Sequence, residues 1–187
     1  MRPLTYASLA LVVLIVSWAV FRVVVRRDYQ RHGKLTPLAV FMEYVAIGSW
    51  VGFTYANVPR DWPAVHVGPG LEVVGSILFY GGLALTLLSM TSLGFGRSHG
   101  RSVTQLRQSG FYRWSRNPQA VAFVAAIIGN LALWPSWKNL VSLVLLVVLL
   151  RLMVHTEEEH LQRVFGADYD QYCRRVPRFV GLRTGGE

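Results

Sequence analysis

Long apolar runs constrain this chain more than any other feature of its sequence. A membrane-spanning helix requires about 20 mostly apolar residues, and several runs reach or approach that length. Hydrophobic residues make up 52% of the chain and charged residues only 16%, which is apolar for a soluble domain. We therefore predict an all-α integral membrane bundle with about five transmembrane helices. The expected helices are Leu4–Val25, Thr36–Tyr55, Leu71–Leu93, Gln119–Trp134 and Lys138–Val154.

The first apolar run, Leu4–Val25, is expected to remain in the protein as a transmembrane helix. It is too long for the apolar part of a signal peptide, and no small-residue cleavage site follows it. Arg26 and Arg27 close it as a stop signal would. The polar segment Arg26–Lys34 (RRDYQRHGK) is predicted to be a short basic loop before the second helix.

The last two apolar runs are predicted to form a helical hairpin over residues 119–154. Pro135, within the sequence WPSW, disfavours an uninterrupted helix at the turn. The fifth helix is expected to continue beyond the membrane to Phe165, where Gly166 is a suitable C-terminal cap. The 187 residues suffice for one domain, with three N-terminal helices in residues 1–93 and a catalytic half in residues 94–187.

The distribution of basic residues predicts the orientation in the membrane. Of the 19 lysines and arginines, only Arg2, Arg60 and Lys138 fall on one side of the predicted helices, and sixteen fall on the other. The positive-inside rule then places the N-terminus outside and the C-terminus in the cytosol; if the protein is bacterial, the membrane is the cell (inner) membrane. The net charge of +9 fits membrane topology better than nucleic-acid binding.

Several ionisable residues outside the main motifs are candidates for isolated functional sites. Glu43 lies within a predicted span, where a carboxylate is costly and suggests function; alternatively, it lies near the cytosolic end and pairs with an arginine of a loop. The single Cys173 excludes an internal disulfide and a cysteine-based zinc site. His155 and His160 are five residues apart, off the one-turn spacing of helical metal ligands, so no metal is expected.

Two polar stretches, Gly110–Gln119 and Glu157–Phe179, both fall on the predicted cytosolic face. Their acids suit a cationic ligand, their arginines suit a carboxylate, and their tyrosines and tryptophan suit a base or a cation. The sequence contains no phosphate-binding loop of the G-x-x-x-x-G-K-[ST] type and no G-x-S-x-G elbow. Composition alone does not distinguish a ligand site from a solvated face that binds lipid headgroups.

The C-terminal half, from Leu93 to Phe179, resembles the isoprenylcysteine carboxyl methyltransferase family, whose wider group includes membrane phospholipid methyltransferases. The order and spacing of several short motifs around the predicted hairpin carry the resemblance. These motifs are Gly110-x-Tyr112, Arg116-Asn117-Pro118, Glu157-Glu158-x-x-Leu161, Phe165-Gly166-x-x-Tyr169-x-x-Tyr172 and Val176-Pro177-Arg178.

The resemblance implies an integral membrane enzyme that uses S-adenosylmethionine, bound in a cytosolic pocket between the loop before the hairpin and the segment after it. It also implies a lipidic methyl acceptor, either an isoprenylcysteine-type carboxylate or a phospholipid amine, that enters from the bilayer. Arg151 and Arg174 are the candidate catalytic residues, as partners of an acidic acceptor. The candidate cofactor-binding residues are Gly94, Gly96, Leu106, Gly110, Tyr112, Arg116, Asn117, Pro118, Glu157 and Glu158.

The two glutamates of the candidate pair are not expected to contribute equally. Adjacent helix positions point about 100° apart, so one glutamate can hold the cofactor while the other holds an arginine such as Arg116 or Arg151. We expect the turn Arg116–Pro118 to lie close to Glu157 and Glu158.

Several positions depart from the pattern of the resembled family, and they leave the acceptor open. The departures are at Thr104, Phe111, Asn117, Gln119, Met153 and His155. Two rival functions also remain: an NADPH-dependent membrane reductase of similar helical layout, and a non-catalytic protein whose basic loops bind anionic lipid. The glutamate pair favours a cationic cofactor over a polyanionic one.

Overall fold

The computed structural model describes residues 3–56, 67–93, 106 and 108–180. The described residues form helices and no strand, as the apolar runs predict. The elements are α1 (Pro3–Trp18), the π-helix η1 (Ala19–Val25), α2 (Arg26–His32), α3 (Pro37–Ala56), α4 (Pro69–Leu93), the 3₁₀ turn η2 (Gly110–Arg113), α6 (Pro118–Leu133), α7 (Trp137–Phe165) and α8 (Ala167–Arg175).

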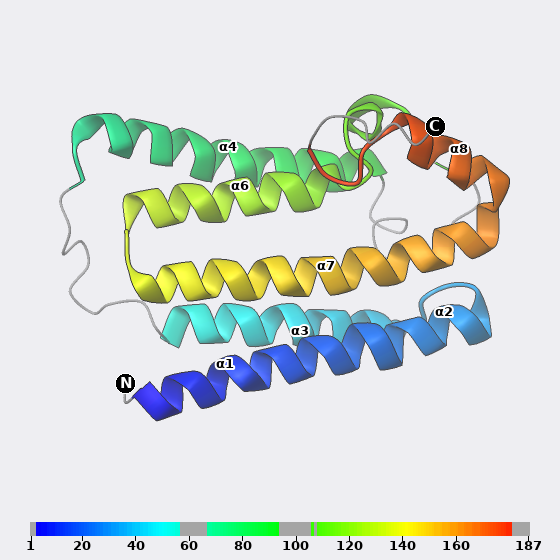
Figure 1. Ribbon diagram of the computed structural model, residues 1–187, viewed down its shortest axis with the longest axis horizontal. Helices are drawn as coiled ribbons and strands as arrows, with labels where there is room; N and C mark the ends of the chain where they lie inside the picture. Colours follow the sequence, from blue (N-terminus) through cyan, green and yellow to red (C-terminus); the bar gives the residue numbers. More distant parts are fainter. Residues whose placement is uncertain (1–2, 57–66, 94–105, 107, 181–187) are drawn as a thin grey trace.

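The helices lie side by side with their long axes nearly aligned (Figure 1). α7 occupies the middle of the bundle and contacts α1, α3 and α6. α4 and α6 form one side of the molecule, and the pair α1 and α3 forms the other (Figure 1). The C-terminal helix α8 and the turn η2 lie at the same end of the bundle, so the two polar stretches of the sequence meet there.

The predicted basic loop at Arg26–Lys34 is wrong, because the chain remains helical to the end of α2. η1 and α2 continue α1 without a break. The helix ends at Gly33, whose φ of 65° is a backbone conformation that glycine adopts without a steric penalty. The charged residues of this segment have a helical partner: Arg26 lies 2.8 Å from Glu159 of α7. A polar composition therefore marks a helix–helix contact here, not a turn.

The predicted hairpin and its polar extension are confirmed. α6 ends at Leu133 and α7 begins at Trp137, on either side of Pro135. α7 then runs for 29 residues to Phe165, and Gly166 follows with a positive φ of 50°.

α4 and α6 approach so closely that Gly82 and Gly129 cannot be replaced without displacement of the neighbouring helix. A Cβ atom built on Gly82 of α4 would lie 2.6 Å from the carbonyl oxygen of Ala122. A Cβ atom on Gly129 of α6 would clash with the amide nitrogen of Phe79. Small residues at an interface allow membrane helices to pack backbone against backbone, and this contact fixes where α6 begins.

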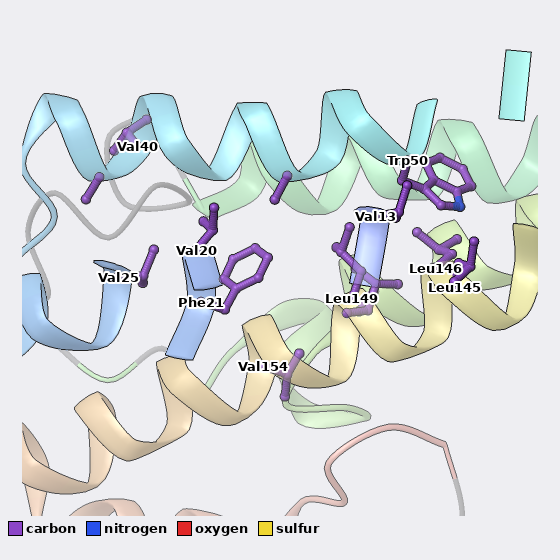
Figure 2. Close-up of a cluster of buried hydrophobic side chains, with 14 of the residues drawn as sticks. Val13, Val20, Phe21, Val25, Val40, Trp50, Leu145, Leu146, Leu149 and Val154 are labelled. Carbon is purple, nitrogen blue, oxygen red and sulfur yellow. The ribbon is translucent and has the colours of Figure 1, made fainter. Parts of the chain in front are cut away.

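The apolar core lies between α7, α3 and the continuous helix formed by α1, η1 and α2. Figure 2 shows Phe21 of η1 between α3 and α7, and Leu146 and Leu149 on the α7 side of the same cluster. Trp50 of α3 donates its indole N–H to the carbonyl oxygen of Ser142 at 2.8 Å, which satisfies a polar group inside this core.

Four of the described helices are long and apolar enough to cross a membrane. α6, with 16 residues, is a shorter apolar helix beside them. Large apolar side chains such as Ile77, Tyr80 and Leu87 of α4 are exposed on the outside of the bundle, as expected for a surface that faces lipid. The protein is therefore a multi-pass helical membrane protein. The four helical segments that are long and apolar enough are Leu4–His32, Pro37–Ala56, Pro69–Thr91 and Trp137–Phe165.

Candidate functional site

The polar end of α7 carries three successive glutamates, Glu157, Glu158 and Glu159, that face different neighbours. Since adjacent residues of an α-helix are rotated by about 100°, three in a row point to three sides of the helix. The contacts of each glutamate are therefore different, and they separate structural roles from an available ligand-binding group.

Glu159 links α7 to the continuous helix formed by α1, η1 and α2. Its carboxylate lies 2.9 Å from Arg22 and 2.8 Å from Arg26. Thr156, three residues before Glu159, donates its hydroxyl to the carbonyl oxygen of Phe21 at 3.1 Å. Phe21 belongs to the π-helix η1, and π-helical turns displace backbone carbonyls from the regular α-helical pattern. These contacts satisfy the polar groups where the two helices cross.

Glu158 is held by two arginines, and we call this group of three the Glu158 clamp. The carboxylate is 7% exposed. Oε1 lies 2.9 Å from Nη1 of Arg116, and Oε2 accepts from Nε of Arg178 at 2.8 Å and lies 2.7 Å from its Nη2. Each carboxylate oxygen thus has an arginine partner at hydrogen-bond distance, which is the condition for a largely buried ion pair to be tolerated. Both oxygens of Glu158 are engaged within the chain.

Arg116 is further fixed by α8. Its Nη1 donates to Sγ of Cys173 at 2.7 Å and to the hydroxyl of Tyr169 at 3.4 Å. Burial alone would lower the pKa of Arg116, but the negative charge of Glu158, together with the Tyr169 hydrogen bond, raises it. The guanidinium therefore stays charged at this position.

Backbone hydrogen bonds join the loop before α6 to the segment after α8. Arg116 N–H donates to the carbonyl oxygen of Pro177 at 2.9 Å, and Nδ2 of Asn117 donates to that of Arg178 at 3.0 Å. Pro118 begins α6, where the missing N–H of proline is tolerated. The turn Arg116–Pro118 is thereby held next to Glu158, and Arg116, expected close to the glutamate pair, contacts one of them directly.

Tyr172 of α8 fixes the other end of the same loop. Its hydroxyl donates to the carbonyl oxygen of Tyr112 at 2.8 Å, and both residues are buried. Burial raises the pKa of Tyr172 to about 12, with Arg116 opposing the shift. The phenol therefore remains protonated and able to donate throughout the neutral pH range. Leu106 packs against Tyr169 and Tyr172 in the same apolar cluster.

Glu157 differs from its two neighbours because no arginine, lysine or histidine of the described chain pairs with it. Its side chain is half-buried. It lies within electrostatic range of Glu43 in α3 and Tyr29 in α2, on the inner side of the bundle. A carboxylate enclosed near a second carboxylate is unfavourable without a cation. Of the three glutamates, Glu157 is thus the one without a basic partner among the described residues.

A cavity of about 890 Å³ lies between α6 and α7, below the segment that follows α8. Its floor is apolar and includes Val124 and Ile128 of α6 and Leu150 of α7. Four arginines also line it. An apolar cavity with a few convergent charged groups is the usual form of a small-molecule site, and this one suits an anionic headgroup with an apolar chain. The four arginines are Arg116, Arg151, Arg174 and Arg178.

The structure brings only some of the predicted site residues together. Arg151 of α7 and Arg174 of α8, the two predicted catalytic residues, line the same cavity. Gly110 has a positive φ of 63° and begins η2. Gly94 and Gly96 lie outside the described residues. Among the described residues no cluster of three or more His, Cys, Asp or Glu residues has the arrangement of a metal site.

Arg178 and Arg22 are ion-pair partners of the glutamates that the sequence alone did not assign. Arg178 appeared only as part of a motif, yet it supplies half of the Glu158 clamp. Arg22 interrupts an apolar helix, and Glu159 follows the glutamate pair. An isolated charge in an otherwise apolar helix indicates an opposite charge on a neighbouring helix, and that signal was present in the sequence.

A comparison with known proteins identifies one matching family. A family model described as phospholipid methyltransferase matches residues 71–168, just over half of the chain. The match runs from α4 through α6 and α7 to the start of α8, so it includes the turn Arg116–Pro118 and all three glutamates. No curated protein and no solved structure matches the chain.

Proposed function

Since this chain belongs to the phospholipid methyltransferase family and is a membrane methyltransferase, we propose that its methyl donor is S-adenosylmethionine and its acceptor a lipid. The donor is bound at Glu157, and the acceptor occupies the arginine-lined cavity between α6 and α7. The observation that carries the proposal is that Glu157 alone of the three glutamates lacks a basic partner in the described chain.

The groups present fit this donor. It carries an ammonium and a sulfonium, and a carboxylate in a partly dehydrated site attracts a cation more strongly than it would in water. Further buried polar atoms near the start of α6 lack hydrogen-bond partners in the described part of the protein, namely Oε1 of Gln119 and Nε of Arg116. Buried polar atoms without partners are rare in folded proteins, and a polar ligand would supply the missing bonds.

The acceptor cavity fits a lipid with an anionic group. Arg151 and Arg174 are exposed at its rim, whereas Val124 and Leu150 form its apolar wall. Arginine binds phosphate and carboxylate through two parallel hydrogen bonds, and an acyl or isoprenoid chain would lie along the apolar wall. Both a phospholipid and a prenylated carboxylate have this chemistry.

The chain's own residues act by positioning and by excluding water. S-adenosylmethionine supplies a methyl group on a positively charged sulfur. Holding the acceptor in line with that methyl group provides much of the acceleration, and the apolar walls keep water out. A carboxylate acceptor requires no general base, whereas a protonated amine must first lose a proton. The Glu158 clamp fixes the loop and the segment after α8 relative to each other.

Ligand-dependent thermal unfolding of the detergent-purified protein tests the donor. S-adenosylmethionine and S-adenosylhomocysteine are expected to raise the melting temperature, by an amount that grows with ligand concentration. NADPH serves as the matched control, because the rival reductase would bind it instead. Stabilisation by NADPH alone would contradict the proposed donor. So would the absence of stabilisation by both S-adenosylmethionine and S-adenosylhomocysteine. Transfer of radiolabel from methyl-labelled donor into a lipid extract identifies the acceptor fraction.

We further propose that the N-terminus lies outside and that the α8 end of the bundle is cytosolic. In a Cys173→Ser background, a cysteine at exposed Glu72, in the first turn of α4, should be labelled by a membrane-impermeant reagent in intact cells. A cysteine at exposed Asp170 of α8 should be labelled only after lysis. The expectation follows from the excess of basic residues at the α8 end. Equal labelling of both positions in intact cells would rule out this orientation.

A further inference from the structure

The carboxylate of Glu43 occupies a position in α3 that the fold otherwise reserves for core residues. Ala39, Ala46, Trp50 and Phe53 are spaced by seven, four and three positions, so these buried residues lie on one face of α3. Glu43 falls within this series, four residues after Ala39 and three before Ala46. It lies six residues inside α3, about 9 Å of helical rise from Pro37. The buried residues of α3 are Ala39, Val40, Ala46, Trp50 and Phe53.

No basic side chain of the described chain pairs with Glu43. The alternative that it simply pairs with a basic residue of the segment after the first helix is therefore not what the described residues show. Arg22 and Arg26, the arginines of that region that form ion pairs, are engaged with Glu159 instead. Glu43 and Glu157 lie within electrostatic range of each other.

A second observation indicates a ligand close to Glu157. His160 lies three residues after Glu157, one turn further along the same side of α7. Its ring stacks on Tyr29 of α2, with centroids 4.0 Å apart and an interplanar angle of 13°. His160 is only 2% exposed, yet neither of its ring nitrogens has a hydrogen-bond partner in the described part of the protein. Buried, unpartnered ring nitrogens require a polar partner.

We infer that Glu43 is a second carboxylate of the donor site, placed against the sulfonium, while Glu157 holds the ammonium. The inference rests on the proposed function and extends it to a helix outside the residues that the family model matches. Two carboxylates within electrostatic range of each other match a ligand with two positive charges. An ammonium has three N–H groups and suits the half-buried Glu157 near the polar helix end. A sulfonium donates no hydrogen bond, so its charge suits a carboxylate on an apolar helix face.

This placement makes Glu43 a specificity-determining residue for the charged donor. In the reaction, a lone pair of the acceptor forms a bond to the methyl carbon, and the electron pair of the broken carbon–sulfur bond stays on sulfur. The sulfonium thereby becomes a neutral thioether, while the ammonium is unchanged. The attraction of Glu43 for the ligand is lost with the sulfonium charge, so Glu43 favours binding of the donor over retention of the product.

Binding titrations of the full-length protein in detergent, with S-adenosylmethionine and with S-adenosylhomocysteine, test the inference. For Glu43→Gln we expect the affinity for S-adenosylmethionine to fall on the order of tenfold and the affinity for S-adenosylhomocysteine to remain unchanged. Glu43→Asp, which keeps the charge, should restore most of the loss. Glu72→Gln is the matched control, because Glu72 is exposed in the first turn of α4 and should alter neither affinity.

The outcomes separate this inference from the proposed function. Equal losses for both ligands in Glu43→Gln, or no loss for either, would overturn the role of Glu43 while leaving the donor assignment intact. A wild-type protein that binds neither ligand would overturn the proposed function and this inference together. The unchanged affinity for S-adenosylhomocysteine also serves as the check that the variant is folded.

Discussion

Replacing Glu157 by glutamine is expected to weaken S-adenosylmethionine binding about tenfold to a hundredfold and to leave the protein folded. The estimate follows from the loss of one charge-assisted interaction, which typically contributes about 1.5–3 kcal/mol. Glutamine keeps the size of the side chain, and Glu157 forms no ion pair in the described chain that the substitution would break. Calorimetric titration of the purified variant measures the effect.

Glu158→Gln is the matched comparison, one residue further along α7. Its carboxylate already binds Arg116 and Arg178, so the main loss should be in stability. Removing one partner of a fully buried pair costs about 3–5 kcal/mol. A smaller cost is expected here, because the Arg178 side chain is 49% exposed and water screens it. If Glu157→Gln binds the donor as the wild type does, Glu157 is not part of the donor site.

Gly82→Ala is expected to destabilise the protein by about 1–3 kcal/mol, because the added methyl group has no space. Its Cβ would lie 2.6 Å from the backbone oxygen of Ala122 and 2.6 Å from the amide nitrogen of Ala126. Both obstacles are backbone atoms of α6, so relief requires α4 and α6 to separate. Since the turn Arg116–Pro118 leads directly into α6, methyl transfer should fall as well.

Gly81→Ala provides the control at the neighbouring position. Nothing lies within 4 Å of a Cβ atom built on Gly81, and the residue is exposed. We expect this variant to unfold at or above the wild-type temperature, because alanine favours the helix over glycine. Thermal unfolding of both variants in the same detergent makes the comparison. Equal destabilisation of the two would show that helix propensity, and not the α4–α6 contact, controls the result.

The sequence alone determined most of the helices and several of their ends. Apolar runs of about 20 residues have few alternatives in a membrane protein, since a helix satisfies its backbone hydrogen bonds internally. Local rules then fixed boundaries: Pro118 begins α6, Pro135 separates α6 from α7, and Gly166 ends α7. The order of the short motifs was also sufficient to indicate the family and to place Arg116 near the glutamate pair.

The tertiary structure decided which of the neighbouring glutamates is available to a ligand. Their sequence context is nearly identical, and the helical period states only that they point in different directions. Glu158 meets Arg116 and Arg178, and Glu159 meets Arg22, more than 130 residues earlier in the chain. Partners so distant are set by how the helices pack, not by local propensity.

The same reason explains the one segment that was predicted wrongly. Arg26–Lys34 has the composition of a loop when its neighbours in sequence are considered alone. In the fold this segment forms α2, which lies against α7. There Arg26 forms an ion pair with Glu159, and Tyr29 stacks on His160. Such contacts stabilise a helix through packing that local sequence does not encode. Sequence therefore determined what each segment is able to form, and helix packing determined which of its side chains remain free for chemistry.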